Sequence, residues 1–295
     1  MRNKLVILLC IIGLSSQAQP YLELISLHAA NEPTSTLYKG EDEAHIKNTW
    51  NLANLNAPII IDKRNIIVFS PGYENRTFSQ GQSDTRIYTL YFPLTYEHTF
   101  KDTMNKLSGT LIYRYNSTNK INPGIKNDML GGAILFTHIC NPKFDWKAGI
   151  YYNKEFYGDY FLPLVGFDWQ ASDRLFIWGL LPNNATLDYA VTNNFHAGFN
   201  FYATEESYLT EGKNAYFHFL EVQLRLFADY YIPKTPLALT LEVGHTMLRK
   251  YESHDDNSSP QDFILKPTES AVLRVGIAWR FTTNNAFKTQ RALTH

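Results

Sequence analysis

The residue types that most often carry out catalysis or bind metal ions form no recognisable motif in this chain. There is no G-x-S-x-G sequence, and Ser79-Gln80-Gly81 lacks the preceding glycine that a nucleophilic serine turn needs. There is also no H-x-x-x-H or C-x-x-C pair that could hold a metal. We therefore predict that the chain is not an enzyme and that it uses no metal and no cofactor. The histidines considered as general bases are His98, His138, His196, His218 and His245.

Two further features could carry chemistry, and a structural interpretation is favoured for both. The segment Glu252–Asn257 holds three carboxylates, which could bind a divalent cation weakly, but a solvated loop explains it more simply. Cys140 lies in a turn-like segment, and we identify no neighbour that would stabilise its thiolate. An outer-leaflet lipid-modifying enzyme, with Ser and His brought together from different strands, remains a minority alternative.

Charged residues do recur at every second position in the second half of the chain. From Tyr216 to Tyr230 the even positions are apolar apart from His218, whereas the odd positions include Glu221, Gln223, Arg225 and Asp229. Successive side chains of a β-strand point to opposite faces, so one face is apolar and the other is charged. In a membrane β-barrel the apolar face meets lipid and the polar face lines the lumen. The residues that we expect to line the lumen are Glu221, Gln223, Arg225, Glu242 and Arg274.

The turn Tyr230–Thr235 predicts how these residues meet. If it pairs Asp229 with Pro236, then Gln223 lies opposite Glu242, and Glu221 and Arg225 lie diagonally from Glu242. Buried charges must be paired or hydrated. The group therefore forms either a salt-bridge plug, the interpretation that we slightly favour, or a polar constriction that selects solutes.

The alternation extends over most of the chain and predicts an all-β fold, a single antiparallel transmembrane β-barrel. We expect twelve strands. Two of them are short for a membrane strand of roughly 9–11 residues, so ten strands is the alternative. The long connections follow odd-numbered strands and so lie on one side, as in bacterial barrels. The predicted strands are Pro58–Phe69, Arg86–Tyr96, Leu107–Asn116, Asp128–Ile139, Asp145–Lys154, Asp159–Trp169, Arg174–Leu181, Ala185–Val191, Phe195–Thr204, Ala215–Asp229, Pro236–Arg249 and Ser270–Phe281.

Composition agrees with this class of protein. The chain has 27 Lys+Arg against 28 Asp+Glu, which argues against a nucleic-acid partner. Aromatic residues make up 15% and charged residues only 19%. After the N-terminus no stretch reaches the roughly 18–20 apolar residues of a membrane helix. Outer-membrane lipid is therefore the expected surrounding, with the barrel as a monomer.

The ends of the chain differ from the barrel. Residues 1–18 read as a cleaved secretory signal peptide, with basic residues before an apolar stretch of ten, Leu5–Leu14, and small residues before the cleavage site. In residues 19–57, apolar and polar residues do not alternate with a clear period. We expect a periplasmic or irregular segment there, part of which could be an extra strand. The barrel then covers residues 58–281, and residues 282–295 form a C-terminal tail.

The last predicted strand carries an assembly signal. It alternates strictly and ends aromatic-x-aromatic at Trp279 and Phe281, with Gly276 on the opposite face. This ending resembles the signal by which outer-membrane barrels are recognised for assembly, although here a tail follows it. The barrel-assembly machinery is thus an expected partner during biogenesis.

The stretch from Leu162 to Tyr189 carries a family resemblance. It holds Leu162-Pro163-Leu164-Val165-Gly166-Phe167, then Leu180-Leu181-Pro182, then Leu187-Asp188-Tyr189. This order resembles a family of exported Gram-negative outer-membrane β-barrel proteins of unknown function. The resemblance implies the barrel fold and the outer membrane, and it carries no site residues. Two functions stay open: a narrow, porin-like passive channel for small polar solutes, and a non-transporting structural or adhesion barrel.

Overall fold

The computed structural model describes residues 20–39, 42–118, 127–210, 215–254 and 263–282. The predicted signal peptide, the tail after Thr282 and the loop carboxylates Asp255 and Asp256 lie outside these ranges. Within them, no helix is both long and apolar enough to cross a membrane. The strands are β1 (Tyr21–Lys39), β2 (Asp42–Leu55), β3 (Ala57–Ile60), β4 (Asn65–Phe69), β5 (Gly72–Gln80), β6 (Ser83–Thr99), β7 (Asn105–Thr118), β8 (Asp128–Asn141), β9 (Phe144–Glu155), β10 (Gly158–Gln170), β11 (Leu175–Leu181), β12 (Asn184–Thr192), β13 (Phe195–Leu209), β14 (Tyr216–Tyr231), β15 (Leu237–His254), β16 (Phe263–Pro267) and β17 (Ala271–Thr282).

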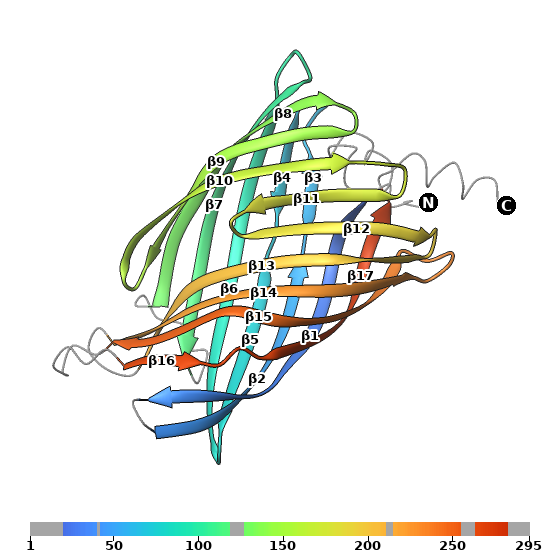
Figure 1. The fold of residues 1–295 in the computed structure, drawn as a ribbon. Coiled ribbons are helices and arrows are strands. Elements are labelled where there is room, and N and C mark those ends of the chain that lie inside the picture. The colour runs from blue at the N-terminus through green and yellow to red at the C-terminus, as the bar shows by residue number, and fades with distance from the viewer. Residues whose placement is uncertain (1–19, 40–41, 119–126, 211–214, 255–262, 283–295) are drawn as a thin grey trace, which may run out of the picture.

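Fourteen of these strands form one closed antiparallel barrel, in the ring order β1, β2, β5 to β15 and β17 (Figure 1). The ring closes where β1 pairs with β17, from Tyr21 opposite Thr282 to Asn31 opposite Leu273. Closure satisfies the backbone groups that an open sheet would expose at its edges. We call the end that holds Tyr21 and Thr282 the terminal end, and the opposite end the far end.

The predicted all-β antiparallel barrel is confirmed, but the predicted number of strands, twelve or ten, is wrong. Residues 21–39 and 42–55, expected to be irregular, are the ring strands β1 and β2. Their inward side chains are mostly small or polar, such as Ser26, His28 and Asn48, and this hid the alternation.

The predicted strand Pro58–Phe69 is also wrong, and so is the long connection, Ser70–Thr85, that its position implies before the next predicted strand. The short strands β3 and β4 extend the hairpin of β2 and β5 toward the terminal end, with a turn at Ile61–Arg64. Most of the supposed loop is strand β5. Prolines and glycine near Pro71-Gly72 obscured a continuous hairpin, because both residues are typical of loops.

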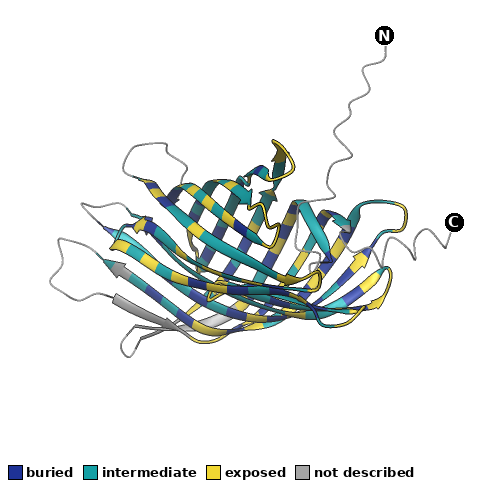
Figure 2. Ribbon diagram, turned by 90° about the horizontal axis from the view of Figure 1, so that it is seen from above, coloured by how far each residue is buried: buried dark blue, intermediate teal, exposed yellow. Residues whose placement is uncertain are grey.

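Side chains alternate between a polar interior and an apolar outer surface, as Figure 2 shows by the alternation of buried and exposed residues along the strands. The outward positions carry large exposed apolar residues all around the ring. They include Leu27 on β1, Leu111 on β7, Ile134 on β8, Ile150 on β9, Phe199 on β13, Leu226 on β14, Leu241 on β15 and Val275 on β17. Such a belt is typical of a barrel that faces lipid.

Leu241→Arg tests the orientation of this belt. Leu241 points outward on β15 and is 48% exposed. A cationic side chain on the lipid face near the midplane costs roughly 2–4 kcal/mol. Urea unfolding in lipid vesicles should therefore show a strongly destabilised barrel, with Leu241→Ile as the matched control close to wild type. A neutral Leu241→Arg would mean that this face meets water.

Candidate functional site

The five residues predicted to line the lumen all point into the barrel. Glu221, Gln223 and Arg225 on β14 and Glu242 on β15 are buried, and Arg274 on β17 is half-buried. They do not form a single group. The structure divides them between two layers of ion pairs at different heights in the lumen.

The predicted register between β14 and β15 is wrong by four residues. Strand β14 continues to Tyr231, which pairs with Ala238, so Gln223 lies opposite Thr246 and Glu242 lies opposite Phe227. The turn is closed by a hydrogen bond from the Ile232 amide to the Leu237 carbonyl, at 2.9 Å. A shift by an even number of residues leaves every side chain on its predicted face, so the inward assignment is unaffected.

The middle layer joins Arg225, Glu242 and Arg274. The Glu242 carboxylate lies 3.0 Å from Nε of Arg225 and 3.1 Å from Nη1 of Arg274. Arg225 also donates to Oδ1 of Asn200 on β13, at 3.3 Å. Two guanidinium groups therefore share one carboxylate, which leaves an excess of positive charge in this layer.

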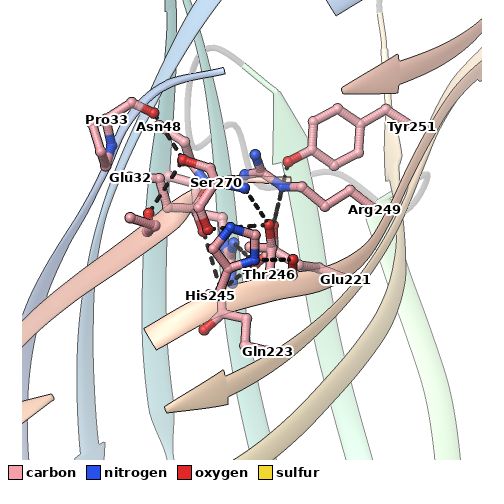
Figure 3. Close-up of polar contacts among 12 residues, drawn as sticks. Glu32, Pro33, Asn48, Glu221, Gln223, His245, Thr246, Arg249, Tyr251 and Ser270 are labelled. Atoms are coloured by element: carbon pink, nitrogen blue, oxygen red, sulfur yellow. Dashed lines mark hydrogen bonds and ion pairs between the residues drawn. The ribbon is translucent and has the colours of Figure 1, made fainter. Parts of the chain in front are cut away.

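The far layer crosses the lumen (Figure 3). Glu221 accepts hydrogen bonds from Nε of Arg249 at 3.0 Å and from Nη1 of Arg76 at 3.3 Å. Arg249 also pairs with Glu32 on β1, and Gln223 donates to Glu32 at 3.1 Å. Arg76 belongs to β5, which four ring strands separate from β14 on the shorter path. These ion pairs therefore hold opposite walls of the barrel together.

An apolar cluster lies next to this layer, toward the far end. It is formed by inward side chains from five strands, β5, β6, β13, β14 and β15, and Phe78 stacks edge-on against Phe219 and Tyr251 at 6.3 and 5.7 Å. Beside it, Ser117 of β7 pairs with Leu209 of β13, although β8 to β12 lie between these strands in the ring. The walls therefore meet at the far end. The members of the cluster are Phe78, Ile87, Tyr208, Phe219 and Tyr251.

A third group of charges lies at the terminal end. Arg280 on β17 pairs with Asp229 at 2.5 Å and with Glu23 at 2.8 Å, and its guanidinium lies 4.2 Å from the ring centre of Tyr21. Both carboxylates of this group thus have a cationic partner, as burial of charge requires.

The open part of the lumen is off-centre. Inward side chains of β14, β15, β17 and β1 are mostly buried against one another, and those of β10 and β12, such as Asp168 and Asp188, are buried too. Many of those on β6 to β9, β11 and β13 remain partly exposed. Because these partly exposed residues point inward, the space that they border lies inside the ring. They include Thr95 on β6, Ser108, Thr110, Ile112 and Arg114 on β7, Ala133, Leu135 and Thr137 on β8, Lys147 and Tyr151 on β9, Leu162 on β10, Trp178 and Leu180 on β11, and Asn200 and Tyr202 on β13.

In the far layer, the sequence did not predict three charged residues: Glu32, Arg76 and Arg249. Glu32 and Arg76 lie in segments that were expected to be irregular or loop. Arg249 follows a bulge at Met247, which reverses the alternation and turns Arg249 inward. The alternation Glu74-x-Arg76-x-Phe78 was the signal that could have found β5.

The histidines considered as general bases have separate partners among the described residues. His196 lies 2.9 Å from the buried Asp188 carboxylate, and His98 and His138 each contact an asparagine, Asn65 and Asn105, at 2.8 Å. His218, expected on the outer face, lies between two carboxylates, 3.0 Å from Glu205 and 2.9 Å from Glu252. His245 is at the surface beside Glu269. Across the described ranges, no cluster of three or more metal-ligating side chains occurs.

The residues of the predicted assembly signal lie on β17, next to the closure with β1. Trp279 is outward and exposed, and its ring lies 6.4 Å from that of Phe281. Gly276 lies opposite His28, and a Cβ at this glycine would come within 2.2 Å of the His28 ring. The glycine therefore makes room for His28, while its role in assembly stays a prediction.

Comparison with known proteins agrees with the fold. A family model described as Domain of unknown function (DUF6268) matches residues 73–280. A Pseudomonas aeruginosa FadL homologue is similar, with a TM-score of 0.52 and 11% identity over 89% of this chain and 91% of that chain. The COG4313 outer-membrane channel from Pseudomonas putida F1 is similar with a TM-score of 0.47 and 10% identity, over 89% of this chain and 97% of that chain. No curated protein matches. The predicted resemblance to an outer-membrane barrel family of unknown function is confirmed.

Glu221→Gln tests whether the far layer is dry. Removing the charge takes away the carboxylate that Arg76 and Arg249 share, while each arginine keeps a second partner, Glu74 and Glu32 respectively. Losing hydrogen bonds to a charged group costs about 1.5–3 kcal/mol. Urea unfolding should show a loss of this size. Glu269→Gln is the matched control, because its pair with His245 is exposed and contributes about 0–1 kcal/mol. Equal effects of the two substitutions would show that water reaches the layer.

Proposed function

This chain belongs to the DUF6268 family of domains of unknown function, and we propose that it is a narrow passive channel of a Gram-negative outer membrane. The observation that carries the proposal is the off-centre space inside the ring, bordered by partly exposed inward residues of β6 to β9, β11 and β13. The ion pairs pack the other half of the lumen. These ion pairs narrow the lumen without filling all of it, and the remaining space is the proposed passage.

The location rests on two features. The sequence begins with a predicted export signal, and the outer surface of the barrel carries an apolar belt. Cell fractionation should recover the protein with the outer membrane, and its mobility in gels should change on heating. Recovery as a soluble periplasmic monomer would contradict the location and, with it, the channel.

Small polar solutes are the cargo that we propose. The passage is bordered by hydroxyl groups of Ser108, Thr110 and Thr137, which can hydrogen-bond a solute. Three balanced ion pairs lie on this wall: Lys147 with Asp168 at 2.8 Å, Arg114 with Glu155 at 3.0 Å and Lys106 with Glu97 at 3.1 Å. A lining of this kind favours polar solutes over large apolar ones and gives little selection by net charge.

A second candidate is a non-transporting barrel. It is favoured by the far end, where the apolar cluster and the pairing of Ser117 with Leu209 bring the walls together. In that case the barrel would serve as a scaffold for its far-end loops.

Single-channel recording in a planar bilayer separates the two candidates. We expect a small conductance for the wild type and a marked loss for Ala133→Trp, because Ala133 points into the open side and a bulky ring would fill it. Ile134→Trp is the matched control. Ile134 is the next residue and points outward, so this variant should conduct like the wild type. A wild-type barrel that folds but never conducts would overturn the channel and leave the scaffold.

A further inference from the structure

The wall of the barrel is unusually short at the hairpin of β11 and β12. Strands β11 and β12 have 7 and 9 residues, whereas their neighbours β10 and β13 have 13 and 15. Pairing with the short hairpin ends at Val165 on β10 and at Tyr202 on β13. The hairpin therefore stops well short of the far ends of its neighbours, as Figure 1 shows.

Above the hairpin, the facing edges of β10 and β13 have no strand between them. Residues 158–164 of β10 pair only with β9, and residues 204–208 of β13 pair only with β14. We call this break in the hydrogen-bonded wall the side gap. Its floor is the turn at Leu181–Asn183, where the Asn183 carbonyl accepts a hydrogen bond from the Ala203 amide at 2.8 Å.

At Ser207, side chains of other strands bond to the backbone of β13 where a neighbouring strand is missing. At the far margin of the side gap, Glu155 accepts hydrogen bonds from the Ser207 amide at 3.2 Å and from the Ser207 hydroxyl at 2.7 Å. Asn116 donates to the Ser207 carbonyl at 2.8 Å. The turn between β9 and β10 is thereby held against β13, and it roofs the open side of the lumen at the far end.

A second set of bonds spans the side gap itself. The Tyr160 hydroxyl on β10 donates to the Glu205 carboxylate on β13, which also lies 3.0 Å from Nε2 of His218. This bond limits the width of the gap near its top. The gap is thus bounded on all sides, by β10, β13, the hairpin below and the roof above.

The surroundings of the side gap are apolar on the outside. Phe161, Val165 and Leu181 point outward next to it and are 61%, 63% and 43% exposed. Charged Asp159 and Lys154 follow immediately toward the far end, and both are exposed. The gap therefore lies where the apolar belt meets the charged rim, which is the level of the membrane interface.

The inner side of the gap opens toward the open half of the lumen. Leu162 on β10, Leu180 on β11 and Tyr202 on β13 point inward there and remain partly exposed. Two apolar side chains and one tyrosine border the way from the passage to the gap. The other inward residues of the passage are more polar.

We propose that the side gap is the outer mouth of the passage, so that solutes leave or enter the lumen sideways, at the membrane interface, rather than along the barrel axis. The inference rests on the proposed channel and narrows its cargo. Solutes that concentrate at this interface carry a polar group and an apolar group together. Small amphipathic molecules are therefore the class that this mouth admits best.

Lipid contact at an inward residue tests the proposal. In the full chain with Cys10→Ser and Cys140→Ser, Leu162→Cys is labelled with bimane and reconstituted in vesicles that contain brominated phosphatidylcholine. Leu135→Cys, inward on β8 behind a continuous wall, is the matched negative control, and outward Phe161→Cys is the positive control. We expect label 162 to lose most of its fluorescence, like label 161, and label 135 to keep it. Equal protection of labels 162 and 135 would overturn the side mouth.

A measurement of solute flux into vesicles is a second test of the side mouth. Swelling of vesicles in 4-nitrophenyl glucoside should be slowed several-fold by Leu162→Trp, which fills the mouth, and not by outward Phe161→Trp. Unchanged swelling with Leu162→Trp would also overturn the proposal. The channel and the side mouth can fail separately. Conductance without lipid quenching of the label at residue 162 would contradict the side mouth and support the channel. Lipid quenching of that label without any conductance would contradict the proposed channel.

Discussion

Every backbone amide and carbonyl in a membrane-embedded sheet needs a hydrogen-bond partner within the protein, and this fold is organised by that requirement. The pairing of β1 with β17 closes the ring and removes both edges of the sheet. Where the ring is incomplete, above the hairpin of β11 and β12, side chains provide partners for part of the β13 edge. Glu155 and Asn116 bond to the backbone of Ser207, which a neighbouring strand would otherwise satisfy.

The second constraint is the desolvation of charge inside the ring. Buried carboxylates and guanidinium groups are stable only as partners, so the lumen residues are arranged in layers of ion pairs. Glu221 with Arg76 and Arg249 connects β14 with β5 and β15. Because these pairs draw opposite walls together on one side, the remaining space lies against the other wall. The asymmetry of the lumen thus follows from where the charges are placed.

These two constraints connect the proposed passage with its proposed mouth. The apolar cluster around Phe78 and Tyr251 and the pairing of Ser117 with Leu209 bring the walls together at the far end. The same contacts place β7 against β13 and leave β8 to β12 as a separate lobe of the wall. A short hairpin within that lobe is then the natural place for an opening, because the strands on either side of it are already held by other bonds.

The sequence by itself determined the class of fold and the face on which most side chains lie. A period of two is a local property, so Leu241 and Glu242 could be assigned to opposite faces without knowing their neighbours. Ten of the predicted strands, from Arg86–Tyr96 to Pro236–Arg249, and the last strand could be located in the same way. Only the tertiary structure decided which strands pair and which charges meet, because partners such as Arg76 and Glu221 are 145 residues apart. It also decided the number of strands: β1 and β2 bury small and polar residues, so their membership of the ring depends on closure with β17 and β5 rather than on a local pattern.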